Sequence, residues 1–175
     1  MTSHGKALVL ATEKALIVVG TPFGSYEQSP QMAFRRAAWI MKEIGSGPIK
    51  LEGGLWMADT IRFLVQRGIL LMAHIGLTPQ SSHVMGGFKI QGREVDSWLK
   101  HEVDARAVCA AGDFALVLEG MVEGWHVNSP IILRPQQLGS APLRPGMVRY
   151  WCWKICLVRL IGRQNLSNPM RSLAT

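Results

Sequence analysis

The sequence predicts an α/β fold built on a parallel sheet, and two observations support this prediction. Four apolar runs have the length of buried strands; they are ALIVVG (15–20), PIKLEGG (48–54), ILLMAHIG (69–76) and FALVLEG (114–120). Each run is continuous rather than alternating, as in strands that are covered on both faces. Helical patterns separate the runs, and this alternation favours parallel strands joined by right-handed crossovers.

The first helix is predicted to follow the first strand after a loop. Ser29 is a suitable N-cap, Pro30 suits the first helical position, and Gly45 provides a stop. One helical stripe between these signals is apolar and consists of Phe34, Ala37, Met41 and Ile44. An amphipathic helix of this kind would cover one face of the sheet.

Two further helices are predicted between the later strands. The second runs from about 56 to 67 and ends at Gly68, and the third begins near Asp96 and ends at Gly112. Strand, loop, helix and glycine therefore recur three times along the chain.

Polar residues stand at the carboxyl ends of the predicted strands: Lys50, Glu52, His74 and Glu119. In parallel α/β architectures these ends gather the chemistry, because the strand-to-helix loops converge there. Lys50 and Glu52 are two residues apart, so their side chains would leave the same face of a strand. Any one of the four could simply reach water at a strand end, and spacing alone leaves both interpretations open.

The charge distribution divides the chain into two parts. The net charge is +7, but residues 1–123 contain twelve basic and twelve acidic residues, which sum to zero (12 − 12). The other seven basic residues lie beyond, where no acid occurs. An overall positive charge is typical of proteins with anionic partners, yet here it comes only from this tail.

The cysteines and the N-terminal segment bear on the compartment. Cys109, Cys152 and Cys156 are odd in number, and no second Cys or His pair completes a zinc-binding pattern, which favours a reducing, cytoplasmic setting. The apolar run near the N-terminus is interrupted by Glu13 and Lys14 before it reaches the length of a signal peptide or a membrane span. We therefore expect no membrane association.

Five segments resemble one enzyme family: TPFGSYEQSP (21–30), IKLEGG (49–54), MAHIGLTPQS (72–81), GGFKIQGR (86–93) and FALVLEG (114–120). From about His4 to Glu123 the chain resembles ketopantoate hydroxymethyltransferase. The resemblance implies about four strands of a (β/α)8 TIM barrel and a homo-oligomeric enzyme. It also implies transfer of a hydroxymethyl group from 5,10-methylenetetrahydrofolate to 3-methyl-2-oxobutanoate, giving ketopantoate for pantothenate and coenzyme A synthesis, with Mg2+ assisting.

The resemblance also implies roles for the strand-end residues. Removing a proton beside the carbonyl of a 2-oxo acid requires cations to hold the developing enolate and a carboxylate to take the proton. By resemblance Lys50 contacts the substrate, Glu52 belongs to the Mg2+ shell, and Glu119 is the general base. Burial would raise the pKa of such a base. His74 lines the same pocket but receives no role in proton transfer.

The chain departs from the family at the end of the first predicted strand. The family has a metal-binding Asp where this chain has Gly20, which offers no side-chain oxygen. We further expect that the family's earlier strands, with their Asp-Ser motif, are missing. We therefore predict that this chain does not catalyse the reaction.

The resemblance ends near residue 124. We predict a hydroxymethyltransferase domain over 1–124 and an irregular, basic, non-family tail over 125–175. A one-base shift of GMVRYWCWKICLV (146–158) yields a sequence like a late strand of the family, so we interpret the tail as an out-of-frame translation.

Three alternative functions remain open from the sequence. The tail's aromatic and basic residues could form a surface that binds nucleic acid or a membrane, but an out-of-frame origin of the tail argues against this function. The barrel could act on phosphoenolpyruvate or another 2-oxo acid. The chain could also be an inactive remnant that assembles with intact subunits.

Overall fold

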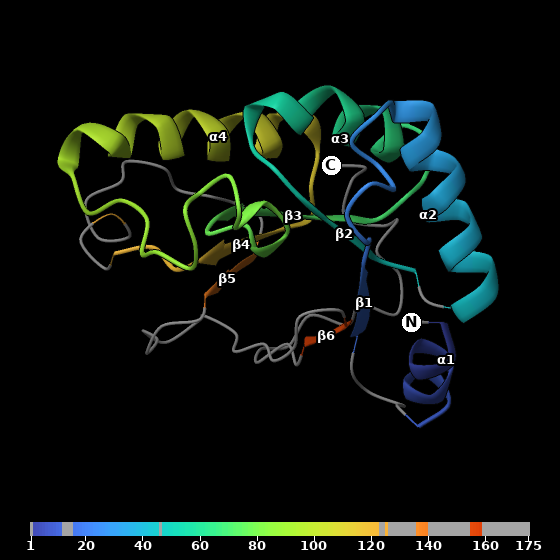
Figure 1. Cartoon of the computed structure of the whole chain (residues 1–175). Helices are drawn as coiled ribbons and strands as arrows, with labels where there is room; N and C mark the ends of the chain where they lie inside the picture. The colour runs from blue at the N-terminus through green and yellow to red at the C-terminus, as the bar shows by residue number, and fades with distance from the viewer. Residues whose placement is uncertain are drawn as a thin grey trace.

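The computed structural model describes residues 2–11, 16–45, 47–122, 125, 136–139 and 155–158. Four parallel strands with helices between them form a curled half-barrel (Figure 1). The strands are β1 (Leu16–Gly20), β2 (Ile49–Glu52), β3 (Leu71–Gly76) and β4 (Ala115–Glu119), and each pairs with the next. This arrangement confirms the predicted α/β fold and partial TIM barrel.

Two short strands extend this sheet. β5 (Gln136–Gly139) pairs in parallel with β4, and β6 (Ile155–Val158) pairs antiparallel with β1. Both lie in the tail that was predicted to be irregular. That prediction is wrong for these two segments, because each is a regular strand. The remainder of the predicted tail, apart from residue 125, lies outside the described residues.

The helix α2 (Pro30–Ile44) begins and ends where the sequence predicted. The Ser29 side chain accepts a hydrogen bond from the backbone N–H of Met32, which satisfies one of the unpaired donors of the first turn. Gly45 adopts a left-handed φ of 75°, and its N–H donates to the carbonyl of Met41. Local capping rules therefore fix this helix.

The other two predicted helices each begin with a short 3-10 turn. η1 (Leu55–Met57) leads into α3 (Ala58–Val65), and η3 (Val95–Ser97) leads into α4 (Trp98–Ala111). A further 3-10 turn, η2 (Pro79–Ser81), follows β3. Figure 1 shows α2, α3 and α4 lying along the same side of the sheet. No helix among the described residues has the length and apolarity needed to cross a bilayer.

A helix that the sequence analysis did not predict, α1 (Thr2–Ala11), packs beside α2. Its Gly5 lies so close to Ile44 that an added Cβ would sit 2.8 Å from two carbons of that side chain. The absence of a side chain at Gly5 thus permits the close approach of the two helices.

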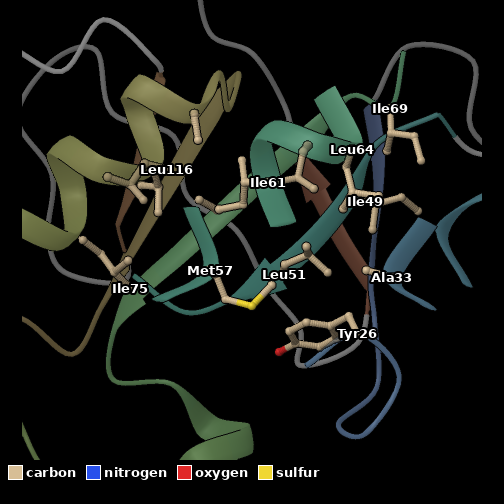
Figure 2. Close-up of a cluster of buried hydrophobic side chains, with 14 of the residues drawn as sticks. Tyr26, Ala33, Ile49, Leu51, Met57, Ile61, Leu64, Ile69, Ile75 and Leu116 are labelled. Atoms are coloured by element: carbon tan, nitrogen blue, oxygen red, sulfur yellow. The ribbon is translucent and has the colours of Figure 1, made fainter. Parts of the chain in front are cut away.

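The strands present two different faces. The helix-covered face carries most of the core, including Ile49, Leu51, Leu71, Ala73, Ile75, Leu116 and Leu118. Figure 2 shows α3 side chains such as Ile61 and Leu64 in this cluster together with Tyr26. The opposite, inner face holds a smaller apolar cluster of Val18, Met72, Ala115 and Val117. Because side chains alternate along a strand, the residues two positions after these apolar ones also face inward.

Candidate active site on the inner face of the half-barrel

The four strand-end residues named in the sequence analysis lie together on the inner face. Glu52 stands opposite His74 across the β2–β3 pair, and Glu119 stands opposite Gly76 across the β3–β4 pair. Lys50, Glu52 and His74 are buried, whereas 23% of the Glu119 side chain is exposed. The parallel register therefore places an amine, an imidazole and two carboxylates at one end of the sheet.

His74 is the centre of this group. Its Nδ1 lies 3.3 Å from Nζ of Lys50 and 3.8 Å from Oε1 of Glu52. Its Nε2 lies 3.3 Å from Oε2 of Glu119 and 3.0 Å from the carbonyl oxygen of Leu77. The imidazole thus contacts or approaches every other member of the site.

A second set of contacts holds Glu52 in place. The backbone N–H of Gln80 donates to Oε2 of Glu52 at 3.0 Å. The hydroxyl of Tyr26 donates to Oε1 of Gln80 at 2.9 Å and accepts from the backbone N–H of Glu52 at 3.3 Å. Burial, followed by the negative charge of Glu27, raises the pKa of Tyr26, so its hydroxyl keeps the proton that this arrangement requires.

Gln80 also connects the site to β1 and the loop after it. Its Nε2 donates to the carbonyl oxygen of Thr21 at 2.7 Å, and the Thr21 hydroxyl donates to the carbonyl oxygen of Lys50 at 3.0 Å. The sequence analysis did not single out Tyr26 or Gln80. Both lie in the segments TPFGSYEQSP and MAHIGLTPQS that carried the family resemblance, and that position was the available signal.

The described residues do not fit a complete Mg2+ centre. They contain no group of three or more His, Cys, Asp or Glu side chains that could hold a metal ion. Glu52 and Glu119 approach opposite nitrogens of the His74 ring, so their oxygens do not converge on one point. Gly20 pairs with Lys50 at the end of β1 and offers no side-chain oxygen.

Comparison with known proteins identifies the family. Residues 1–126 match the model of a family described as ketopantoate hydroxymethyltransferase. The chain belongs to this family. The members of the ketopantoate hydroxymethyltransferase family are enzymes, and the chain's motifs, half-barrel and strand-end residues agree with its membership.

Three relatives show the extent of the similarity, and each is named 3-methyl-2-oxobutanoate hydroxymethyltransferase. The protein of Parvibaculum lavamentivorans is 60% identical over 150 residues, which cover 85% of this chain and 55% of the relative. Those of Bartonella quintana and Bartonella bacilliformis are 49% and 54% identical over 185 residues, which cover 99% of this chain and 67% and 68% of the relatives. The chain thus spans between about half and two thirds of the length of these family members.

The structure brings together all the site residues that the sequence analysis named. Lys50, Glu52, His74 and Glu119 share one face and one end of the sheet. Their roles in substrate binding, metal binding and proton transfer stay predictions.

Proposed function

We propose that this site binds a 2-oxo acid and removes the proton beside its carbonyl, which is the first stage of hydroxymethyl transfer to 3-methyl-2-oxobutanoate. The observation that supports this proposal is the placement of the Lys50 ammonium and the Glu119 carboxylate on opposite nitrogens of the buried His74. A cation and a proton acceptor separated by the His74 imidazole can contact two parts of one small substrate.

Lys50 is the group we propose to hold the substrate. Its side chain is buried on the inner face of β2, where an ammonium interacts with a carboxylate or an enolate more strongly than it would in water. As the proton leaves, negative charge moves onto the substrate's carbonyl oxygen. A fixed ammonium beside that oxygen stabilises the charge as it develops.

Glu119 is the group we propose to remove the proton. It ends β4 on the inner face, and its side chain is the most exposed of the four, which suits a base that must reach a substrate. A positioned carboxylate base typically contributes about 10²–10⁴-fold to a rate. Replacement by Gln removes the proton acceptor and preserves the size of the side chain.

We further propose that this chain does not complete the transfer from 5,10-methylenetetrahydrofolate on its own. Gly20 replaces the Asp expected by family resemblance, and the described residues offer no complete set of metal ligands. The Mg2+ expected for the family would supply electrophilic assistance that Lys50 alone replaces only in part.

Two assays test separately the proposed removal of the proton and the proposed inactivity in the complete transfer. Incubation with 3-methyl-2-oxobutanoate in D2O, followed by proton NMR, should show loss of the signal of the hydrogen beside the carbonyl, and Glu119→Gln should slow this exchange by about 10²-fold or more. Exchange no faster than in buffer would overturn the assignment of the site. Addition of Mg2+ and methylenetetrahydrofolate should give no ketopantoate, and turnover that Glu119→Gln abolishes would refute the proposed inactivity.

A further inference from the structure

His74 is a fully buried group to which the proposed reaction assigns no task. We infer that His74 is a positioning residue: as the Nε2–H tautomer, it accepts a hydrogen bond from Lys50 and directs its own N–H toward Leu77 and Glu119. This inference rests on the proposed function, because it assigns the ring the task of holding the substrate-binding cation and the base in a fixed relationship.

The neighbours of Nε2 require a proton on that nitrogen. The carbonyl oxygen of Leu77 lies at 3.0 Å and Oε2 of Glu119 lies at 3.3 Å. A carbonyl oxygen and a carboxylate oxygen only accept hydrogen bonds, so an unprotonated Nε2 would present a lone pair to two acceptors. With the proton on Nε2, the ring donates to Leu77 and attracts the Glu119 oxygen.

The neighbour of Nδ1 requires that this nitrogen carry no proton. Nζ of Lys50 lies at 3.3 Å, and an ammonium can only donate. A proton on Nδ1 would therefore oppose the ammonium hydrogens. Oε1 of Glu52, at 3.8 Å, is beyond the usual hydrogen-bond distance and does not compensate. Nδ1 thus serves as the acceptor for Lys50.

The backbone around His74 holds this arrangement. The carbonyl of His74 accepts from the N–H of Gly53 at 2.9 Å, which continues the ladder between β2 and β3. The N–H of Leu77 donates to the carbonyl of Glu119 at 2.7 Å, so the residue that accepts from Nε2 is itself attached to β4. Gly76 makes the turn between them with a left-handed φ of 87°.

The His74 ring therefore couples the position of the Lys50 ammonium to that of the Glu119 carboxylate, although these two groups do not need to be in contact. If Lys50 moves, the hydrogen bond at Nδ1 moves the ring, and the N–H at Nε2 changes its distance to the Glu119 carboxylate. A histidine that only filled space would interact with neither charge in a directional way. This difference separates a positioning role from a structural one.

Two substitutions at His74 separate its two hydrogen-bonding edges. The amide nitrogen of a Gln side chain can take the place of Nε2, so His74→Gln keeps a donor toward Glu119 and loses the acceptor for Lys50. The amide oxygen of an Asn side chain can take the place of Nδ1, so His74→Asn keeps the acceptor for Lys50 and loses the donor. His74→Leu removes both and serves as the control for loss of the ring.

The deuterium-exchange assay then shows, for each variant, whether the substitution changes mainly KM or mainly kcat. We expect His74→Gln to raise the KM for 3-methyl-2-oxobutanoate by about 10-fold or more with a smaller effect on kcat, because one hydrogen bond to a charged group is lost. We expect His74→Asn to lower kcat by a similar factor with a smaller effect on KM. Equal changes in both constants for the two variants, matching His74→Leu, would show that the ring only fills space.

A measurement that needs no activity tests the hydrogen-bond assignment itself. Nitrogen-15 NMR of the histidine-labelled, unsubstituted chain should show His74 with a proton on Nε2 and none on Nδ1, the signals being assigned by their loss in His74→Gln. A proton on Nδ1, alone or together with one on Nε2, overturns the inference even if the variants show no activity. Absence of deuterium exchange by the unsubstituted chain would refute the proposed function instead, and the NMR result would still decide the tautomer.

Discussion

The backbone N–H of Gln80 donates to the carboxylate of Glu52 at 3.0 Å, which joins the end of β2 to the 3-10 turn that follows β3. The bond does not depend on the Gln80 side chain, which binds Tyr26 and the carbonyl of Thr21 instead. One residue therefore fixes the carboxylate through its backbone and the surrounding loops through its side chain.

Tyr26→Phe should weaken this connection without creating a cavity. The substitution removes the partner of the part-buried Gln80 amide oxygen and of the buried Glu52 backbone N–H. We expect the free energy of unfolding to fall by about 1–3 kcal/mol, measured by urea denaturation. Gln66→Ala, at an exposed residue just after α3, is the control and should change it by less than about 0.5 kcal/mol.

A double-mutant cycle sharpens the same test. Gln80→Ala removes the other partner, so its effect and that of Tyr26→Phe should not add. We expect a coupling free energy of about 0.5–3 kcal/mol, as for residues in one hydrogen-bond network. Additive effects would show that the two side chains do not form the network described.

Gly20→Asp should increase the affinity of the chain for Mg2+. Val18 belongs to the inner apolar cluster, so the residue two positions later faces the same side, next to Lys50. A second carboxylate near Glu52 provides the oxygen ligands that Mg2+ prefers, and we expect the affinity for Mg2+ to rise by at least about tenfold by isothermal titration calorimetry. Gly20→Asn, of the same shape and neutral, is the control. Equal affinities in the two variants would contradict the assignment of this position to the metal shell.

Asp113 should make the stability of the chain fall between acid and neutral pH. Both carboxylate oxygens are buried, and burial raises the pKa of Asp113 from 3.8 to about 7, an effect that the Cys109 thiol beside it offsets only in part. Between these two values the folded chain keeps a proton that the unfolded chain has lost. The stability therefore decreases as the pH rises through this range and stays reduced above pH 7, by about 4 kcal/mol.

Asp113→Asn should remove this dependence. The neutral amide has no charge to desolvate, so the variant should be more stable than the unsubstituted chain at pH 8 and similar to it below pH 4, as measured by chemical denaturation at a series of pH values. Asp59→Asn, in an exposed position on α3, is the control and should not change the slope in this way. A stability that rises from pH 4 to 7 in the unsubstituted chain, with the same slope in Asp113→Asn, would contradict the prediction.

The nucleotide sequence tests the interpretation of residues 125–175. We expect that restoring one base near codon 125 yields a reading frame that continues the family. The alignments with the Bartonella proteins cover 99% of this chain and extend into this segment, so an in-frame but diverged tail is the direct rival. If no single-base change restores the frame, the hypothesis is wrong.

The elements that sequence reasoning predicted well are those governed by local rules. The ends of α2 follow from Ser29, Pro30 and Gly45, and the strands follow from continuous apolar runs that stop at glycine or a charged residue. The clustering of Lys50, Glu52 and Glu119 followed from one topological rule, since parallel strands bring their carboxyl ends to one edge. None of these predictions required knowledge of distant contacts.

The features that sequence reasoning missed depend on groups brought together by the fold. α1 has little amphipathic pattern and is placed by the fit of Gly5 against Ile44. Tyr26 and Gln80 matter because three separate segments meet at their polar groups. The role inferred for His74 depends on which donor and which acceptor approach each ring nitrogen, and no one-dimensional pattern records that.

The turn at Gly76 carries a consequence for how the site could be damaged. An added Cβ there would collide with the backbone carbonyl of Glu119, and the left-handed backbone would strain any larger residue. A change from glycine to alanine would alter no charge and no catalytic group, yet it would displace the Glu119 carbonyl, which accepts from the N–H of Leu77 and so holds the residue whose own carbonyl orients the imidazole. Loss of function in this region can therefore arise from a methyl group alone.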